Sequence, residues 1–516
     1  MVMTTANICI LVTILIYLLM MIAIGAYFSR INKSTDDFYL GGRRLGPLVT
    51  AMSAEASDMS SWLLLGLPGL ALATGLAEAT WTGIGLAIGT YLNWLFVAKR
   101  LRVYTQKLGA VTIPDFFAKR FGDDKHILTL VSSLFIVIFF VPYTASGFAA
   151  CGKLFSSMFG MDYVMAMIMS AAVIVLYCTL GGFLAASTTD FIQSIVMTIA
   201  LVVVLGFTEG IVNGFDNVFA NVQGLEGYLD IFKGHMIADG SVGSYGALPI
   251  ASTLAWGLGY FGMPHILLRF MAIEDKNKLK LSRRVASVWV VISMAVAILI
   301  GVVGYSVMKS VPGFPQYASN SEAESVVIDV AKLIASHGYI PAVVGGIILA
   351  GILASTMSTA DSQLLAAASA VSQNIVSEFF KVNLGKKASM WIARITVIII
   401  SVIAVFLALN PDSSVFRIVS FAWGGFGACF GPAVLLGLFW KRSNKWGILA
   451  GMISGGAMIF IWKFVVRVAF AGSVLDIYEL LPAFILNLVV AVVVSLITKA
   501  PAKELVDTFE QVKAEE

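Results

Sequence analysis

The chain has 516 residues, of which 59% are hydrophobic and only 12% charged, with a formal net charge of +4. A soluble globular protein carries about 25% charged residues, so this composition excludes that class. The hydrophobic residues recur in segments of about 20, long enough to cross roughly 30 Å of hydrocarbon, and we therefore expect an all-α integral membrane protein.

The first hydrophobic segment, about 7–28, is predicted to be a retained membrane span. The first basic residue, Arg30, follows the segment, and a small-residue cleavage pattern is missing, so it does not resemble a signal peptide. The four cysteines lie in apolar segments without CxxC spacing, and the four histidines show no paired spacing. We expect neither disulfides nor a metal site, and no catalytic constellation indicates an enzyme.

Hydrophobic segments predict thirteen spans in all. Their approximate ranges are 7–28, 48–75, 79–98, 128–152, 160–186, 189–212, 246–270, 284–308, 340–372, 390–409, 414–439, 445–468 and 478–498. Of the 34 Lys and Arg residues, 27 lie in or beside the loops after spans 1, 3, 5, 7, 9 and 11 or in the C-terminal tail. Because such residues collect on the cytoplasmic side, we expect the N-terminus outside and the C-terminus inside.

Polar residues interrupt the second span. Six of the nine residues from Ser53 to Ser61 are Ser, Glu or Asp, and Glu55 and Asp58 would share one face of a continuous helix. One Asp at the centre of a membrane helix costs about 2.5–3.5 kcal/mol. We therefore predict an unwound stretch whose carbonyls and half-helix ends bind ions and substrate. The alternative is a kinked helix with its polar side against the bundle.

The seventh span is interrupted at WGLGYFGMPH, Trp256 to His265. Gly disfavours a helix by about 1 kcal/mol and Pro by about 3 kcal/mol, so three glycines and one proline predict a break. The aromatic residues Trp256, Tyr260 and Phe261 would line it. The alternative is a close helix contact made by the glycines, with the aromatic rings facing neighbouring helices.

Four hydroxyl residues of the ninth span recur at helical spacing: Ser355, Ser358, Thr359 and Ser362. A single membrane hydroxyl commonly bonds back to a carbonyl of its own helix. Four hydroxyls on one face, with Asp361 beside them, favour cation ligands instead.

The two interrupted spans each begin a block of five, which indicates an inverted-repeat transporter with its site near the membrane midplane. Since five is odd, the two blocks would enter the membrane from opposite sides. The expected units are an extra helix and first cytoplasmic loop (1–45), the first repeat (46–212), an external loop (213–245), the second repeat (246–440), two further helices (441–498) and a cytoplasmic tail, helical or disordered (499–516).

Three stretches resemble signatures of the sodium/solute symporter family, closest to the bacterial sodium/proline symporters: SAEASDMSSWLLLGLPG, WGLGYFGMPH and ILASTMSTADSQLL. FYLGGRRLGP (38–47), FGDDK (121–125) and YTASG (143–147) agree with them. The resemblance implies a leucine-transporter-type five-plus-five fold in the bacterial plasma membrane, surrounded by lipid. It also implies sodium-coupled import of L-proline by alternating access, with Na+ as coupling ion, no organic cofactor and no nucleic-acid partner.

The resemblance also implies site residues. Sodium would bind the carbonyls of Ala56, Met59 and Ser355 and the hydroxyls of Ser358 and Thr359, with Asp58 as the carboxylate needed for sodium use. The proline pocket would be lined by Ser60, Trp62, Tyr143, Trp256, Tyr260 and Pro264. Arg43 and Glu78 match positions of cytoplasmic gating and external packing. Asp190, Asp361 and Ser362 resemble a second sodium site of some relatives.

The sequence departs from the close proline carriers at two positions. Met263 stands where they have Gln, and Glu55 stands where they have a small residue. Met263 leaves open a different small amino acid or a monocarboxylate as solute. A non-transporting membrane sensor on the same fold would be expected to continue into a signalling domain, and a passive channel would not need two broken helices.

Overall fold

The computed structural model describes residues 4–30, 35–382, 385–410 and 414–515, and these are almost wholly helical. Parts of the expected N-terminal unit (1–3 and 31–34) and of the tail (516) lie outside the described residues. The elements, with η marking 3-10 and π segments, are α1 (Thr5–Ser29), α2 (Thr35–Leu40), η1 (Gly41–Arg43), α3 (Pro47–Ser61), η2 (Trp62–Gly66), α4 (Leu67–Thr74), α5 (Leu76–Leu92), η3 (Asn93–Val97), α6 (Ala98–Lys107), α7 (Ile113–Phe121), α8 (Ile127–Phe159), α9 (Tyr163–Ile211), α10 (Phe215–Val222), β1 (Lys233–His235), β2 (Val242–Ser244), α11 (Ala247–Leu254), η4 (Ala255–Gly262), α12 (Pro264–Ala272), η5 (Lys276–Lys278), α13 (Leu279–Ser310), α14 (Asn320–Ala323), α15 (Val326–Ala335), α16 (Tyr339–Ser369), η6 (Ala370–Phe379), α17 (Lys386–Leu407), α18 (Val415–Phe439), α19 (Lys445–Ile461), η7 (Trp462–Val466), α20 (Arg467–Ala469), α21 (Leu480–Ile497) and α22 (Lys503–Glu515).

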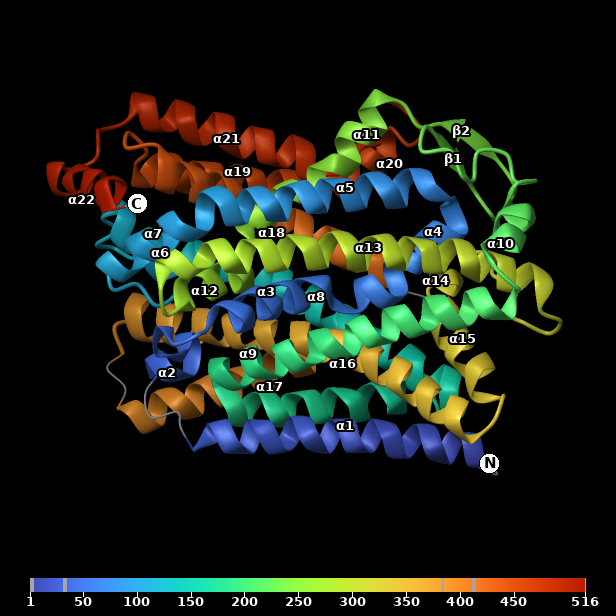
Figure 1. Ribbon diagram of the computed structural model, residues 1–516. Coiled ribbons are helices and arrows are strands. Elements are labelled where there is room, and N and C mark those ends of the chain that lie inside the picture. The colour runs from blue at the N-terminus through green and yellow to red at the C-terminus, as the bar shows by residue number, and fades with distance from the viewer. Residues whose placement is uncertain (1–3, 31–34, 383–384, 411–413, 516) are drawn as a thin grey trace.

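Ten helical segments within the described ranges are long and apolar enough to cross a membrane. They are Thr5–Phe28, Leu76–Lys107, Ile127–Phe159, Gly181–Ile211, Lys276–Ser310, Tyr339–Phe379, Ala388–Leu407, Val415–Phe439, Lys445–Ala469 and Leu480–Ile497. Figure 1 shows the long helices running roughly parallel, with the N- and C-termini at opposite ends of the bundle. The sequence is therefore that of a multi-pass membrane protein, as its composition predicts.

Helix α9 contains two of the expected spans. Its 49 residues would extend for about 74 Å if straight, far more than the roughly 30 Å of hydrocarbon. Gly182 has φ 62° and ψ −168° and divides the helix at this point. The span boundary expected from the sequence lies a few residues later, beyond 186, but the chain turns at the residue that adopts positive φ without a Cβ clash.

Both expected interruptions are present. In α3, Ser60 has φ 47° and ψ −171°, which breaks the helix before η2 and α4 continue it. In the seventh expected span, η4 separates α11 from α12, and Met263 has an extended backbone with φ −79° and ψ 107°. Pro264 follows at the start of α12, where its missing N–H costs no helical hydrogen bond.

The glycines of η4 also make the close contacts of the alternative interpretation. A Cβ added at Gly257 would lie 2.2 Å from the carbonyl oxygen of Gly85 in α5. A Cβ added at Gly259 would lie 2.0 Å from Nε1 of Trp423 in α18. The same glycines therefore allow the break and the tight packing of two neighbouring helices against it.

The polar ends of the bundle are more ordered than the sequence indicated. The expected external loop holds α10 and the β1–β2 hairpin, at the same end as the N-terminus in Figure 1. The tail forms α22, which docks beside α6: Phe509 is buried and Lys107 pairs with Glu515 at 2.5 Å. The lysine ammonium lowers the pKa of the Glu515 carboxyl below its ordinary value.

Candidate functional site

The break in α3 lies against the hydroxyl face of α16. The Ser358 hydroxyl donates to the carbonyl oxygen of Ala56 at 2.8 Å, and the Thr359 hydroxyl donates to the carbonyl of Ser355 at 3.2 Å. The structure thus brings together four of the five expected sodium ligands. The fifth, the Met59 carbonyl, accepts a hydrogen bond from the backbone of Trp62, while the Met59 residue lines the adjoining cavity. Carbonyl and hydroxyl oxygens of this kind are suited to Na+ at a broken helix.

Asp58 is the junction between the break and two other helices. The Tyr260 hydroxyl of η4 donates to Oδ2 of Asp58 at 2.5 Å, and the Tyr143 hydroxyl of α8 donates to its carbonyl oxygen at 3.2 Å. The side chain is buried, with 6% of its surface exposed. These contacts of Asp58 hold the broken segment of α3 against η4 and α8.

Aromatic side chains surround a small cavity of about 10 Å³ at the same junction, which is room for about one water molecule. Its lining residues are Asp58, Met59, Trp62, Leu86, Tyr143, Trp256, Val419 and Trp423. The rings of Trp62 and Trp256 lie 5.8 Å apart with an angle of 33° between their planes. Three of the six expected pocket residues, Trp62, Tyr143 and Trp256, therefore face one space.

The other three expected pocket residues lie beside this cavity, and among the described residues they are not part of its lining. The Ser60 hydroxyl accepts from the Trp62 amide at 3.1 Å, and Tyr260 reaches the cavity wall through Asp58. Pro264 is buried in the first turn of α12. Met263 is fully buried beside it and does not line the cavity among the described residues.

Trp423 of α18 is a wall residue that the sequence analysis missed. Its indole N–H donates to the carbonyl oxygen of Trp256 at 2.8 Å, and its ring meets that of Tyr260 edge-on at 5.0 Å. The available signal was a tryptophan next to paired glycines in an apolar span, AWGGFG. That signal is weak, because such a residue usually packs between helices.

Glu55 turns away from the cavity, toward α5 and η3. Its Oε1 accepts from Trp94 Nε1 at 2.8 Å and from the Thr90 hydroxyl at 3.1 Å. Both donors are buried. The carboxylate that departs from the close proline carriers thus connects α3 to the next span.

Asp190, Asp361 and Ser362 do come together, but around an arginine. Asp190 Oδ2 accepts from Arg269 Nη2 at 3.0 Å, and the Ser362 hydroxyl lies 2.5 Å from the same nitrogen. The Ser362 hydroxyl in turn donates to Asp361 at 2.9 Å. Arg269, missed in the sequence analysis, had a clear signal as a lone charge in the apolar run HILLRFMA.

Arg43 lies at the end of the bundle near α12. Its guanidinium donates to the carbonyl oxygens of Met271 at 2.6 Å, Ala110 at 2.7 Å and Thr105 at 3.2 Å. It therefore ties the end of the second broken helix to α6 and the segment after it. Glu78 lies in the first turn of α5.

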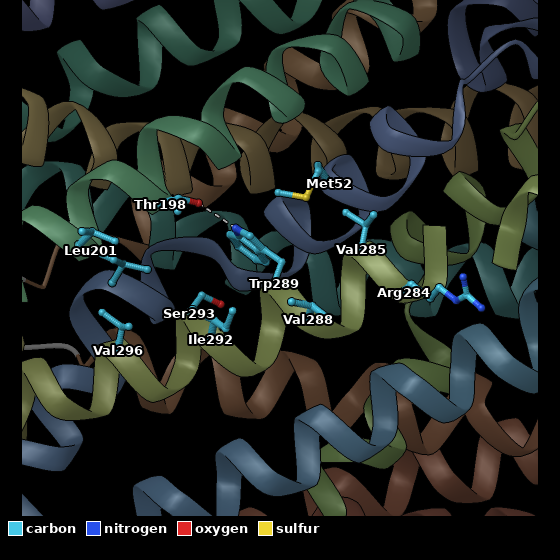
Figure 2. Close-up of a pocket in the computed structure, with 11 residues that line it drawn as sticks. Met52, Thr198, Leu201, Arg284, Val285, Val288, Trp289, Ile292, Ser293 and Val296 are labelled. Carbon is cyan, nitrogen blue, oxygen red and sulfur yellow. Dashed lines mark hydrogen bonds between the residues drawn. The ribbon is translucent and has the colours of Figure 1, made fainter. Parts of the chain in front are cut away.

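A separate apolar groove runs between α9 and α13 (Figure 2). Its hydroxyls are few, and the Thr198 hydroxyl is used by the indole N–H of Trp289 at 2.9 Å. Val288 and Ile292 on its rim are 59% and 56% exposed, as lipid-facing residues are. The exposed apolar rim of the groove is suited to contact with lipid, whereas the polar residues gather at the breaks.

The chain is similar to known transporters in sequence and in fold. The sequence model of the sodium:solute symporter family matches residues 38–455. The osmoregulated proline transporter of Bacillus subtilis (strain 168) is 43% identical over 96% of both chains. The sodium/proline symporter of Escherichia coli (strain K12) is 40% identical over 98% of this chain and 96% of that protein. In fold, the chain is similar to a Na+-coupled sialic acid symporter, with a TM-score of 0.76 and 18% identity over 96% of this chain and 99% of that one.

Proposed function

Because the chain belongs to the sodium:solute symporter family, we propose that it is a secondary active symporter that imports L-proline with Na+ by alternating access. The choice of solute is carried by one observation: two relatives at 40–43% identity, aligned over nearly their whole length, are named for proline. The small aromatic cavity supports it, since an apolar ring packs well on aromatic faces.

The proposed sodium ligands are the carbonyls of Ala56, Met59 and Ser355 and the hydroxyls of Ser358 and Thr359, with Asp58 required nearby. The 2.8 Å contact between the Ser358 hydroxyl and the Ala56 carbonyl supports this set, because it brings oxygens of α16 and α3 within reach of one ion. A hydroxyl can turn its proton away and offer its lone pairs to a cation.

The proposed solute pocket consists of Trp62, Tyr143 and Trp256, with Ser60, Tyr260 and Pro264 around it and Trp423 as a further wall. A second half-helix begins just after the break at Ser60, and helix N-termini are suited to anions such as the solute carboxylate. Arg43 would control the cytoplasmic side, and Glu78 would stabilise packing on the external side. The carbonyls held by Arg43 on three separate segments support its gating role.

The proposed topology has thirteen spans, with the N-terminus outside and the C-terminus inside the plasma membrane. To the ten apolar helices it adds the broken segments 47–74 and 247–272 and the shorter helix Tyr163–Thr179. An odd number agrees with termini at opposite ends of the bundle (Figure 1). The proposed units are 1–45, repeats 46–212 and 246–440 around the loop 213–245, then 441–498 and the tail.

Uptake of radiolabelled proline into proteoliposomes tests this function. An inward sodium gradient should drive uptake, and unlabelled proline should compete better than other small amino acids or monocarboxylates. If another solute competes best, the assignment of proline is wrong while symport stands. If sodium has no effect on any solute, symport itself is wrong.

A further inference from the structure

Arg269 is a buried charge that connects four helices, about one turn along α3 and α16 from the candidate sodium ligands. It lies on α12 with 1% of its surface exposed. Its Nη2 donates to Asp190 Oδ2 of α9 at 3.0 Å and to the Ser362 hydroxyl of α16 at 2.5 Å. Its Nε donates to the Ser53 hydroxyl of α3 at 3.0 Å. Thus both broken helices, represented by α3 and α12, and the hydroxyl-bearing helix α16 meet at one guanidinium.

The oxygen atoms around Arg269 form the kind of set that binds a cation. The Ser53 hydroxyl donates to Asp190 Oδ2 at 2.7 Å, so its lone pairs remain directed at the guanidinium. A guanidinium has five N–H donors and no acceptor, and therefore matches a cluster of carboxylate and hydroxyl oxygens. The Arg269 guanidinium, which is part of the chain, therefore supplies the positive charge that the buried Asp190 carboxylate requires.

We propose that the guanidinium of Arg269 is the built-in cation of this cluster and takes the place of a second sodium ion. Asp190, Asp361 and Ser362 are the residues where the sequence predicted that ion, and Arg269 bonds two of them directly. Because the guanidinium cannot leave, it adds no ion to the transport cycle. The inference rests on the proposed sodium symport and deepens it: the protein couples one Na+ to each solute.

Removing the Arg269 guanidinium should leave a cluster of oxygen atoms that can bind a second sodium ion. Asp190 Oδ1 and Asp361 Oδ2 are both buried, and neither has a hydrogen-bond partner within the part of the chain that the structure describes. In Arg269→Ala, these oxygens and those of Ser53 and Ser362 would surround a space with no positive charge. A free cation of suitable size would then be recruited.

The experiment counts bound sodium on the purified full-length chain by equilibrium binding of radioactive ²²Na+. The wild type should bind one ion per chain and Arg269→Ala two. Guanidinium ion should displace only the additional sodium of the variant. Arg269→Lys, which keeps a positive charge, and Arg269→Ala with Asp190→Ala, which removes both charges, should each bind one. A count for Arg269→Ala equal to that of the wild type overturns the inference, whereas a wild type that binds no sodium contradicts the symport function itself.

A measurement on the wild type keeps the inference testable if Arg269→Ala does not fold. The ratio of ²²Na+ to labelled solute entering the same proteoliposomes should be one. A ratio of two would mean that a second ion moves despite Arg269, and would overturn the inference.

Discussion

At the scale of single residues, the Asp58 carboxylate can serve sodium use or hold the broken segment, and a substitution can separate these two roles. Its Oδ2 accepts the Tyr260 hydroxyl, and an amide oxygen can accept the same bond. Asp58→Asn therefore removes the charge but keeps the link between the broken helices. We expect the sodium concentration for half-maximal transport to rise about tenfold or more, equivalent to about 1.4 kcal/mol or more.

The matched variant is Tyr260→Phe, which removes the hydrogen bond and keeps the charge. It should lower thermal stability while changing the sodium requirement less than Asp58→Asn does. Sodium activation curves of well-expressed variants decide the matter: an unchanged curve for Asp58→Asn would show that the carboxylate only holds the unwound segment.

Trp256 gives the second residue-scale prediction. Its ring packs 5.8 Å from that of Trp62 in the cavity lining, while the hydrogen bond from Trp423 goes to its backbone carbonyl and survives a side-chain change. Trp256→Ala should weaken proline binding by about 1–3 kcal/mol through lost aromatic contact. Equilibrium binding measures this, with Phe416→Ala as control, because Phe416 packs 5.4 Å from Trp256 outside the cavity lining among the described residues. Equal losses in both variants would mean that Trp256 only packs.

At the scale of elements, the glycine-rich η4 depends on the absence of one side chain. An added Cβ at Gly259 would meet the Trp423 indole at 2.0 Å and disturb its bond to Trp256. Gly259→Ala should therefore lower the free energy of unfolding by about 1–3 kcal/mol, as overpacked cores do, and also reduce solute affinity. Thermal denaturation in detergent provides the measurement. Gly206→Ala in α9 meets nothing within 4 Å and should not be destabilising, and a similar fall in both variants would contradict the packing argument.

The elements that the sequence predicted best are those that local chemistry decides. The breaks at Ser60 and in η4 follow from polar residues, glycines and a proline in spans that are otherwise apolar. The partners of Arg269 and the position of Trp423 did not follow, because they join segments far apart in the sequence and depend on how helices pack. The docking of α22 was missed for the same reason: Phe509 is buried against Tyr104 and Arg100 of α6 and Arg120 of α7, far away in the sequence.

At the scale of the whole molecule, several buried carboxylates are paired with cations of other segments. Asp190 is paired with Arg269, Arg467 bonds Glu479 at 2.9 Å, and Lys153 bonds Glu324 at 3.1 Å. Breaking such a pair exposes an uncompensated charge, so these links are expected to persist in the conformations of the cycle. The charge that crosses the membrane is then that of the transported ion, since a zwitterionic solute carries none.

Transport should therefore be electrogenic and concentrative. One charge moving through roughly 100 mV releases about 2.3 kcal/mol, and a tenfold sodium gradient adds about 1.4 kcal/mol. Together, about 3.7 kcal/mol would sustain a proline gradient of roughly 500-fold with one sodium per solute. In proteoliposomes with imposed sodium and an inside-negative potential, proline should rise above equilibrium, and collapse of the potential should lower the plateau. Uptake that stops at equilibrium, or that is equal without sodium, would identify a facilitator, because a coupled cycle cannot lose its driving ion and keep its solute gradient.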